Sequence, residues 1–149
     1  MTIRVRTAGK GDLPALVELL RVLFAIEADF RPDGERQRRG LAAMLDDPER
    51  RVVFVAEGDG VIVGMATGQL VISTAEGGAA CVVEDVVVAA DWRGHGIGGW
   101  LVDEVTRWAR RRNATRLQLV ADRENEPALR FYDRHGWRRT RLVALHRGL

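Results

Sequence analysis

The 149 residues of the chain suffice for one domain with a buried core, and 46% apolar with 30% charged residues is typical of a globular protein. No apolar run approaches the ~20 residues of a membrane span, and the first residues lack the pattern of a secretory signal, so we expect a cytoplasmic protein without a membrane partner. A net charge of +2 with one lysine, Lys10, gives no strong positive field and disfavours a nucleic-acid partner, and the single cysteine, Cys81, excludes an intrachain disulfide.

In chain order, the first half is predicted to form a strand, two helices and two paired strands. Alternating apolar and charged residues indicate a half-buried strand over Ile3–Ala8, and Asp12 is expected to cap the helix that follows. A second helix is predicted over Glu35–Leu45. Two strands, Arg51–Glu57 and Val61–Ser73, flank a Gly-Asp-Gly turn that is typical of a β-hairpin.

The second half is predicted to alternate strands and helices. The valine-rich run Cys81–Ala89 indicates a strand covered on both faces, and an amphipathic helix after a glycine-rich segment is expected to end near Asn113. The remaining predicted elements are a strand over Arg116–Ala121, a helix over Glu126–His135 and strand character over Trp137–His146. This order predicts one α/β domain over residues 1–149 with a mixed sheet of about six or seven strands.

The candidate binding site is the loop Arg93–Gly99, between the valine-rich strand and the amphipathic helix. Its glycines lack a Cβ, so backbone N–H groups can converge on a ligand, and the helix start adds unpaired N–H groups and the positive end of the helix dipole. Arg93 adds a cationic side chain at the rim. The loop therefore predicts a site for a phosphate or diphosphate, the alternative being a tight turn that binds nothing.

A dinucleotide-binding site of the Rossmann type is an alternative for the same loop. Gly94, Gly96 and Gly99 satisfy the spacing G-x-G-x-x-G, and Asp122 lies about where a ribose-binding acid is expected. That motif begins at the end of a strand, however, whereas Ala89–Arg93 intervene here, and too little chain follows for a doubly wound sheet. No lysine follows the glycines as it does in a Walker A loop.

The segment Arg93–Gly98 resembles the R/Q-x-x-G-x-G/A signature of the GCN5-related N-acetyltransferase (GNAT) family. A second segment, Asn125–Tyr132 followed by Gly136 and Trp137, is similar to the family motif N-x-x-A-x-x-F-Y-x-x-x-G-F, with Trp137 in place of the phenylalanine. The resemblance implies the GNAT fold, a mixed and mostly antiparallel sheet of six or seven strands flanked by about four helices. It also implies acetyl-CoA as the co-substrate.

The resemblance further implies which residues bind acetyl-CoA. The strand before the loop pairs its backbone with the pantetheine arm, and the loop with the start of its helix binds the diphosphate. Asn125 is expected to fix the arm or to cap the following helix, and Arg134 to reach the phosphates or to lie exposed. The implied cofactor-binding residues are Val86, Val87, Val88, Arg93, Gly94, His95, Gly96, Ile97, Gly98, Gly99, Asn125 and Arg134.

Two side chains are candidates for the chemistry, in which a neutral amine attacks the thioester and the leaving thiolate is stabilised. Tyr132, the only tyrosine, matches a family position that often gives the thiolate its proton, with packing against Phe131 as the alternative. Glu84 matches an acid that acts as general base in some small-amine acetyltransferases, with a salt bridge as the alternative. Successive strand residues point to opposite faces, so one of the two carboxylates can face the acceptor while the other faces away, and Asp85 is expected to support packing or turn hydrogen bonds.

The acceptor is predicted to be a small molecule with a primary amine, such as a polyamine, an aminoglycoside or an amino acid. Glu27 and Asp29, between the two N-terminal helices, are candidates to attract a cationic amine, with a solvated helix end as the alternative. A nearby group of arginines favours instead an acceptor that carries a carboxylate. These are Arg31, Arg36, Arg38 and Arg39.

The prediction is therefore an acetyl-CoA-dependent N-acetyltransferase, for which family resemblance allows a homodimer. No metal is expected, because His95, His135 and His146 lack the spacing of metal ligands. Two alternatives stay open. One is a catalytically silent acyl-CoA-binding or regulatory module on the same fold, and the other is a protein or peptide N-acetyltransferase.

Overall fold

The structure is a computed structural model that describes residues 1–27 and 29–149. It divides into two compact units, residues 1–118 and residues 119–149. The first unit contains the β-sheet, and the second contains the helix α4 (Glu126–Arg134).

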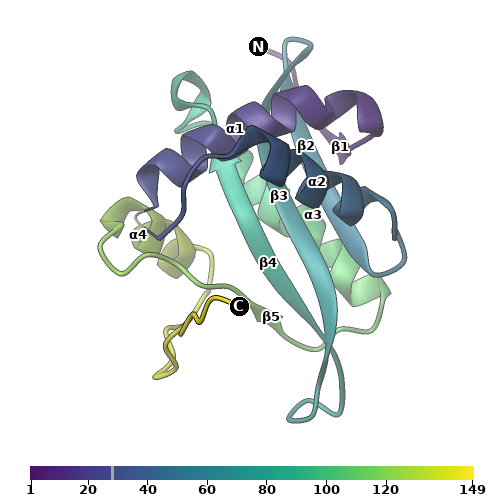
Figure 1. Cartoon of the computed structure of the whole chain (residues 1–149), viewed down its shortest axis with the longest axis vertical. Helices are drawn as coiled ribbons and strands as arrows, with labels where there is room; N and C mark the ends of the chain where they lie inside the picture. The colour runs from purple at the N-terminus through teal and green to yellow at the C-terminus, as the bar shows by residue number, and fades with distance from the viewer. Residues whose placement is uncertain (28) are drawn as a thin grey trace. The chain divides into compact units, whose positions relative to one another are not determined.

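The sheet of the first unit has five strands among the described residues, in the order β1-β2-β3-β4-β5 (Figure 1). Neighbouring strands are antiparallel except for β4 and β5, which are parallel. The strands are β1 (Ile3–Thr7), β2 (Arg51–Gly58), β3 (Val61–Ser73), β4 (Gly78–Val88) and β5 (Leu117–Gln118). The predicted mixed and mostly antiparallel sheet is confirmed, whereas the predicted six or seven strands are too many.

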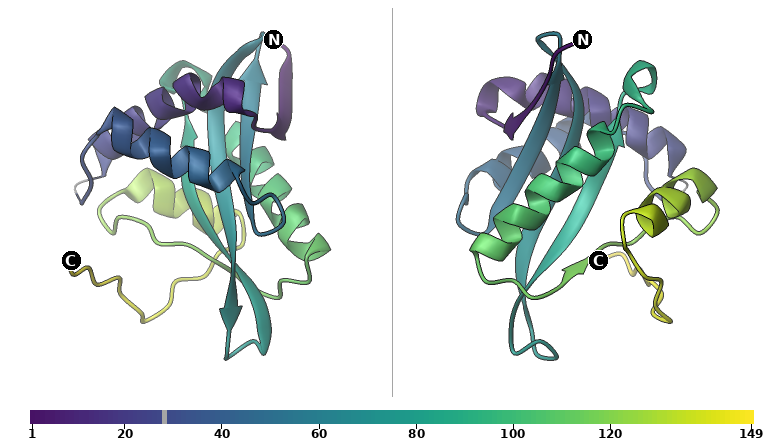
Figure 2. Two further views of the ribbon diagram at one scale, coloured as in Figure 1. Left: turned by 45° about the vertical axis from the view of Figure 1, so that its right-hand side comes forward. Right: turned by 180° about the vertical axis from the view of Figure 1, so that it is seen from behind.

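Helices cover both faces of this sheet (Figures 1 and 2). The helices α1 (Leu13–Ile26) and α2 (Gly34–Leu45) lie on one face, and α3 (Ile97–Arg111) lies on the other. Leucines at helical spacing give α1 one apolar face, and Leu16 from this face is buried with Met65 of β3 in the same cluster. Each such side chain contributes about 1.5–3 kcal/mol by leaving water.

Two glycines of β3 let α3 lie close to the sheet. A Cβ at Gly68 would come within 2.8 Å of Val105 Cγ1 and 3.2 Å of Cys81 Sγ, and a Cβ at Gly64 would come within 3.1 Å of Leu101 Cδ1. Cys81 is fully buried in this layer, and burial raises the pKa of its thiol to about 11. The close contact lets α3 pack directly against the sheet.

Arg6 ties the N-terminal strand to its neighbours. Its guanidinium donates to both carboxylate oxygens of Asp12, at 2.8 and 3.0 Å, and to Glu57 Oε1 at 2.7 Å. Asp12 also accepts from the backbone N–H of Gly9 at 2.8 Å, and its pKa is lowered, chiefly by Arg6. The predicted capping of α1 by Asp12 is wrong, because this carboxylate is bonded to Arg6 and Gly9 and makes no side-chain bond to the start of α1.

The second unit is built around α4. Asn125 caps the helix, since its side chain accepts from the backbone N–H of Ala128 at 3.2 Å. Pro127 lies in the first turn, and Gly136 adopts φ +84° just beyond the end, a conformation that disfavours other residues. The helix predicted over Glu126–His135 is therefore confirmed.

Two predicted strands differ from the structure. β5 occupies two residues of the predicted Arg116–Ala121, because only Leu117 and Gln118 pair with β4. Residues 137–146 form no strand, and the side chains of Leu142 and Val143 are exposed. An alternating pattern indicates that a segment suits a strand, but a strand also requires an edge to pair with, and no strand of the described residues pairs with this segment.

Within residues 1–27 and 29–149, no helix is long and apolar enough to cross a lipid bilayer. In the same residues, no group of three or more His, Cys, Asp or Glu side chains is placed to hold a metal ion.

Candidate active site

The site begins at an irregularity in β4. Between the register pairs Thr67–Glu84 and Met65–Val87, two residues of β4 oppose one residue of β3, which is a β-bulge. One of the two is Asp85, whose φ of +53° is rare for a residue other than glycine. Because Thr67 and Met65 share one face of β3, Glu84 and Val87 both face the side of the sheet that α1 covers. The bulge thus overturns the simple alternation expected along β4.

The bulge brings carboxylates from two elements together. The pKa of Asp85 is raised to about 7, chiefly by burial and also by the negative charges of Glu84 and Glu27, while a contact with the Thr67 hydroxyl acts in the opposite direction. The Thr67 hydroxyl donates to the carbonyl oxygen of Glu84 at 3.1 Å. Glu27 is the C-cap of α1, so a negative charge at the end of that helix acts on Asp85 in the bulge.

The structure brings some of the predicted site residues of this region together and leaves one apart. The structure places Glu84 and Glu27 near one another through Asp85, whereas Asp29 is an exposed residue beyond the end of α1. Asp85 is expected to support packing or turn hydrogen bonds, and the structure gives it a contact with the Thr67 hydroxyl. The negative charges of Glu84 and Glu27 also act on Asp85, which that expectation did not include. The signal in the sequence was the pair of adjacent acids in an otherwise apolar strand, which is expensive unless the charges have a role.

One edge of β4 is only partly paired. β5 pairs with Cys81 and Val82 alone, so among the described residues no strand continues this edge toward Val88. The backbone of the predicted pantetheine-binding residues Val86 and Val87 lies along this stretch. The carbonyl oxygen of Val88 accepts from Arg93 Nε at 2.9 Å, so at this residue the edge already has a partner for its carbonyl group.

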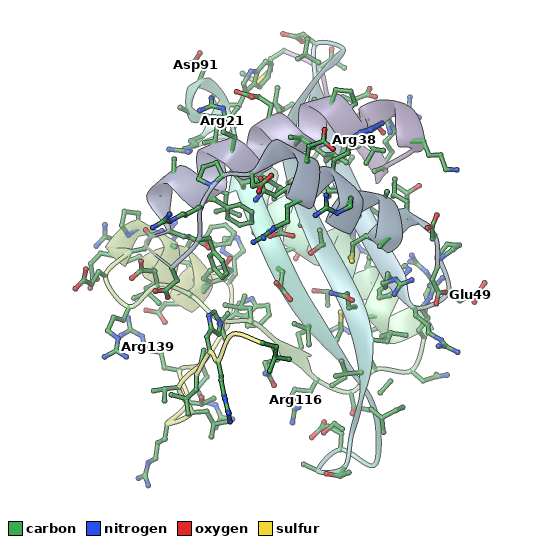
Figure 3. All side chains as sticks on the ribbon, viewed as in Figure 1. Arg21, Arg38, Glu49, Asp91, Arg116 and Arg139 are labelled. Carbon is green, nitrogen blue, oxygen red and sulfur yellow. The ribbon has the colours of Figure 1, made fainter. Side chains whose placement is uncertain are left out.

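The loop after β4 presents its backbone as predicted. It follows the short helix η2 (Ala90–Trp92), whose Asp91 projects away from the sheet (Figure 3). Gly94 and Gly96 adopt φ +80° and +78°, and a Cβ at either would meet no atom within 4 Å, so the approach to their backbone is open. α3 starts at Ile97 without a side-chain cap, so its first N–H groups can donate to an anionic ligand. This geometry fits a diphosphate.

His95 and Arg93 of the loop bond to nearby backbone carbonyl oxygens. His95 Nδ1 lies 3.1 Å from the carbonyl oxygen of Trp92 and 3.0 Å from that of Arg93. Both neighbours are acceptors, so Nδ1 carries the proton and donates. Together with the bond from Arg93 to Val88, this contact sets the shape of the loop before any ligand arrives.

The remaining predicted residues belong to the second unit. Tyr132 is half-buried and makes edge-to-face contacts with Phe131, with ring centroids 5.1 Å apart, and with Trp137, at 5.8 Å. Asn125 caps α4 as described above, and Arg134 is exposed in the last turn of that helix. The packing of Tyr132 against Phe131 is present.

The fold and the loop define an α/β protein with a glycine-rich turn between a bulged strand and a helix. Comparison with known proteins agrees with this fold. The family model of the acetyltransferase (GNAT) family matches residues 14–137. The chain belongs to this family, whose members are acyltransferases that use acetyl-CoA as co-substrate. The predicted family and fold are confirmed.

Three relatives illustrate the match. An uncharacterized N-acetyltransferase of Methanocaldococcus jannaschii is 27% identical over 95% of the chain and 63% of its own length. Streptothricin acetyltransferase of Streptomyces lavendulae is 30% identical over 85% of the chain and 60% of its own length. A solved structure from Agrobacterium tumefaciens superimposes with a TM-score of 0.82 and 29% identity, covering 97% of this chain and 99% of that one. The chain thus spans less than two thirds of the length of the first two of these proteins.

Proposed function

We propose that residues 1–149 act as one N-acetyltransferase domain that moves the acetyl group of acetyl-CoA to the primary amine of a small molecule by direct attack. The observation that carries the proposal is the open backbone of Gly94 and Gly96 at the start of α3, next to the unpaired edge of β4. An edge that lacks a strand suits an extended amide chain, and a helix start suits a diphosphate. Pantetheine joined to a diphosphate has this order of groups.

In this proposal the backbone of Val86, Val87 and Val88 pairs with the pantetheine arm, and the loop Arg93–Gly99 binds the diphosphate. The bond from Arg93 to Val88 uses only Nε, so the terminal nitrogens of the guanidinium can reach a phosphate oxygen. Arg134 is assigned to the phosphates and Asn125 to the arm as further proposals, in addition to the capping role of Asn125.

The acceptor is proposed to be a cationic amine. Glu27, Glu84 and Asp85 place negative charge at the end of α1 and on β4, which favours a positively charged group over a carboxylate. An amine attacks only after it loses a proton, so one of these carboxylates must accept it. One relative is named streptothricin acetyltransferase, and one neighbouring solved structure is an aminoglycoside acetyltransferase in complex with sisomicin, which supports a small-molecule acceptor.

Two carboxylates are candidates for the general base. Glu84 matches the family position, whereas Asp85 has a pKa near 7, which is suited to accepting a proton at neutral pH and giving it up again. In the proposed reaction the amine nitrogen forms a bond to the thioester carbon, the carbon–sulfur bond breaks, and the amine proton passes to the carboxylate. The phenol of Tyr132 gives its proton to the leaving thiolate.

Release of free coenzyme A from acetyl-CoA, measured over a panel of polyamines, aminoglycosides, amino acids and peptides, tests the proposal. We expect steady turnover with at least one cationic small amine, and a loss of kcat well above tenfold in Tyr132→Phe. A second measurement, calorimetric titration with coenzyme A, separates a silent binding module from an enzyme. Binding without turnover on any amine would favour the silent module, and absence of binding would overturn the proposal as a whole.

A further inference from the structure

One contact next to the cofactor loop has no part in the reaction described above. The indole ring of Trp92, the last residue of η2, lies directly against the backbone of Gly58 at the end of β2. A Cβ built on Gly58 would fall 2.6 Å from Trp92 Cζ3 and 2.7 Å from Cη2, far inside contact distance. Gly58 is buried and Trp92 is half-buried, so the ring occupies the space of the missing side chain.

The hairpin that carries Gly58 is held firmly. Gly58 pairs with Ile3 of β1 and with Val61 of β3. The backbone N–H of Asp59 donates to the carbonyl oxygen of Thr2 at 2.9 Å, and the N–H of Thr2 donates to Asp59 Oδ1, also at 2.9 Å. Because strands on both sides hold this backbone, it cannot move aside for a larger group at position 58.

The loop beyond Trp92 needs such support. Two of the residues between Trp92 and α3 are Gly94 and Gly96, and glycine loses more conformational freedom on ordering than any other residue. At the far end of the loop Ile97 is buried, with its Cγ2 3.4 Å from the Cβ position of Gly64. Trp92 is the matching attachment at the near end, since its ring rests on Gly58 and its carbonyl oxygen accepts from His95.

We propose that Trp92 is a positioning residue of the diphosphate loop and that Gly58, on a different hairpin, is the surface that holds it. The contact orders the loop before the cofactor arrives, so less conformational entropy is lost on binding and the affinity rises. This inference rests on the assignment of the loop to coenzyme A. It adds that a glycine outside every cofactor-binding segment controls the affinity.

Gly58→Ala tests the inference directly. We expect the Kd for coenzyme A, measured by calorimetry, to rise by about tenfold, because the new methyl group displaces the indole ring and the loop with it. The KM for acetyl-CoA should rise in parallel, whereas kcat at saturating acetyl-CoA should change little, since the reacting groups are not altered.

Two control variants separate positioning from general damage. Gly78→Ala adds the same methyl group to a strand glycine whose Cβ position has no atom within 4 Å, so neither Tm nor Kd should change. Gly68→Ala forces a methyl group to 2.8 Å from Val105 in the core, so it should lower Tm and leave the Kd of the folded protein unchanged. Equal increases in Kd for Gly68→Ala and Gly58→Ala would overturn the inference.

Variants of Trp92 test the same contact from the other side. In a Trp92→Ala background, Gly58→Ala should cause no further rise in Kd, because the ring that it displaces is gone. Trp92→Phe should bind more tightly than Trp92→Ala, since a smaller ring still reaches Gly58. Wild-type affinity in Gly58→Ala, or additive effects in the double variant, would overturn this inference alone. Absence of coenzyme A binding by the wild-type protein would overturn the proposed function and this inference together.

Discussion

The diphosphate loop and the carboxylates around Asp85 lie at the two ends of the same short stretch of β4 and η2, yet they are built differently. The loop is one continuous segment that presents its backbone, and its side chains mostly hold it in shape. The carboxylates come from α1 and β4, and only the fold brings their side chains together. The loop should therefore keep its affinity for coenzyme A after side-chain changes that leave the backbone in place. Changes that remove a carboxylate charge should lower turnover.

The largest effect is expected for a backbone change in the loop. Gly96→Val places a β-branched residue at φ +78°, which forces the loop out of its conformation at the start of α3. We expect the Kd for coenzyme A to rise by about 100-fold or more, measured by calorimetry, with an unchanged far-UV circular dichroism spectrum. Gly40→Ala, in a helix and with an open Cβ position, is the matched control. Wild-type affinity in Gly96→Val would remove the loop from the binding site.

The carboxylate side is tested by paired amide variants. Asp85→Asn should lower kcat by roughly 100-fold, because the amide cannot accept the amine proton, while the Kd for coenzyme A stays unchanged. Glu84→Gln makes the same change one residue away. A larger loss of kcat in Glu84→Gln than in Asp85→Asn would identify Glu84 as the base instead.

The pH dependence sharpens the same distinction. With Asp85 as the base, kcat/KM should fall below a pH near 7, where this carboxyl group becomes protonated. Glu27→Gln removes a negative neighbour that helps to raise the pKa of Asp85, so the acidic limb of the profile should move to lower pH. An acidic limb that Glu27→Gln leaves in place would show that Asp85 is not the titrating group.

Stability should report the same buried charge. The folded pKa of Asp85, about 7, exceeds the ordinary value of 3.8, so the folded protein binds more protons than the unfolded chain between these values. The contribution of Asp85 to stability is therefore present at low pH and is lost as the pH rises through this range. Asp85→Asn should have a Tm several degrees above wild type at pH 8, with the difference disappearing toward pH 4. A constant difference at both pH values would contradict the assignment.

The smallest effect is expected outside both regions. Asp12→Asn weakens the paired contact with Arg6 and should lower the free energy of unfolding by about 1–2 kcal/mol, measured by urea denaturation. Neither the Kd for coenzyme A nor the acidic limb of the pH profile should change. Glu18→Gln breaks the exposed contact with Arg21 and should leave stability unchanged, which makes it the matched control.

Sequence reasoning predicted the loop better than the carboxylates for a physical reason. Glycine adopts positive φ values that other residues avoid, so a turn and a helix start could be predicted from Arg93–Gly99 alone. Long patterned elements were readable too, as the agreement for Val61–Ser73 shows. These features depend on interactions between residues that are close in the sequence.

The features that sequence reasoning missed depend on a distant partner. The positive φ of Asp85 follows from the register between β3 and β4, which no alternation of residues reveals. The contact of Trp92 with Gly58 likewise joins residues that are far apart in the sequence. The pattern over Trp137–His146 indicates a strand, but pattern alone does not supply an edge for it to pair with.

The burial of Cys81 has a practical consequence for every measurement of turnover named above. Its sulfur lies under α3, and its raised pKa keeps the thiol protonated at assay pH, so it is a poor nucleophile toward an aromatic disulfide reagent. Because no other cysteine is present, colour development with such a reagent counts only the coenzyme A that the reaction sets free. The protein can therefore be assayed continuously, at high enzyme concentration, without a background from its own sulfhydryl group.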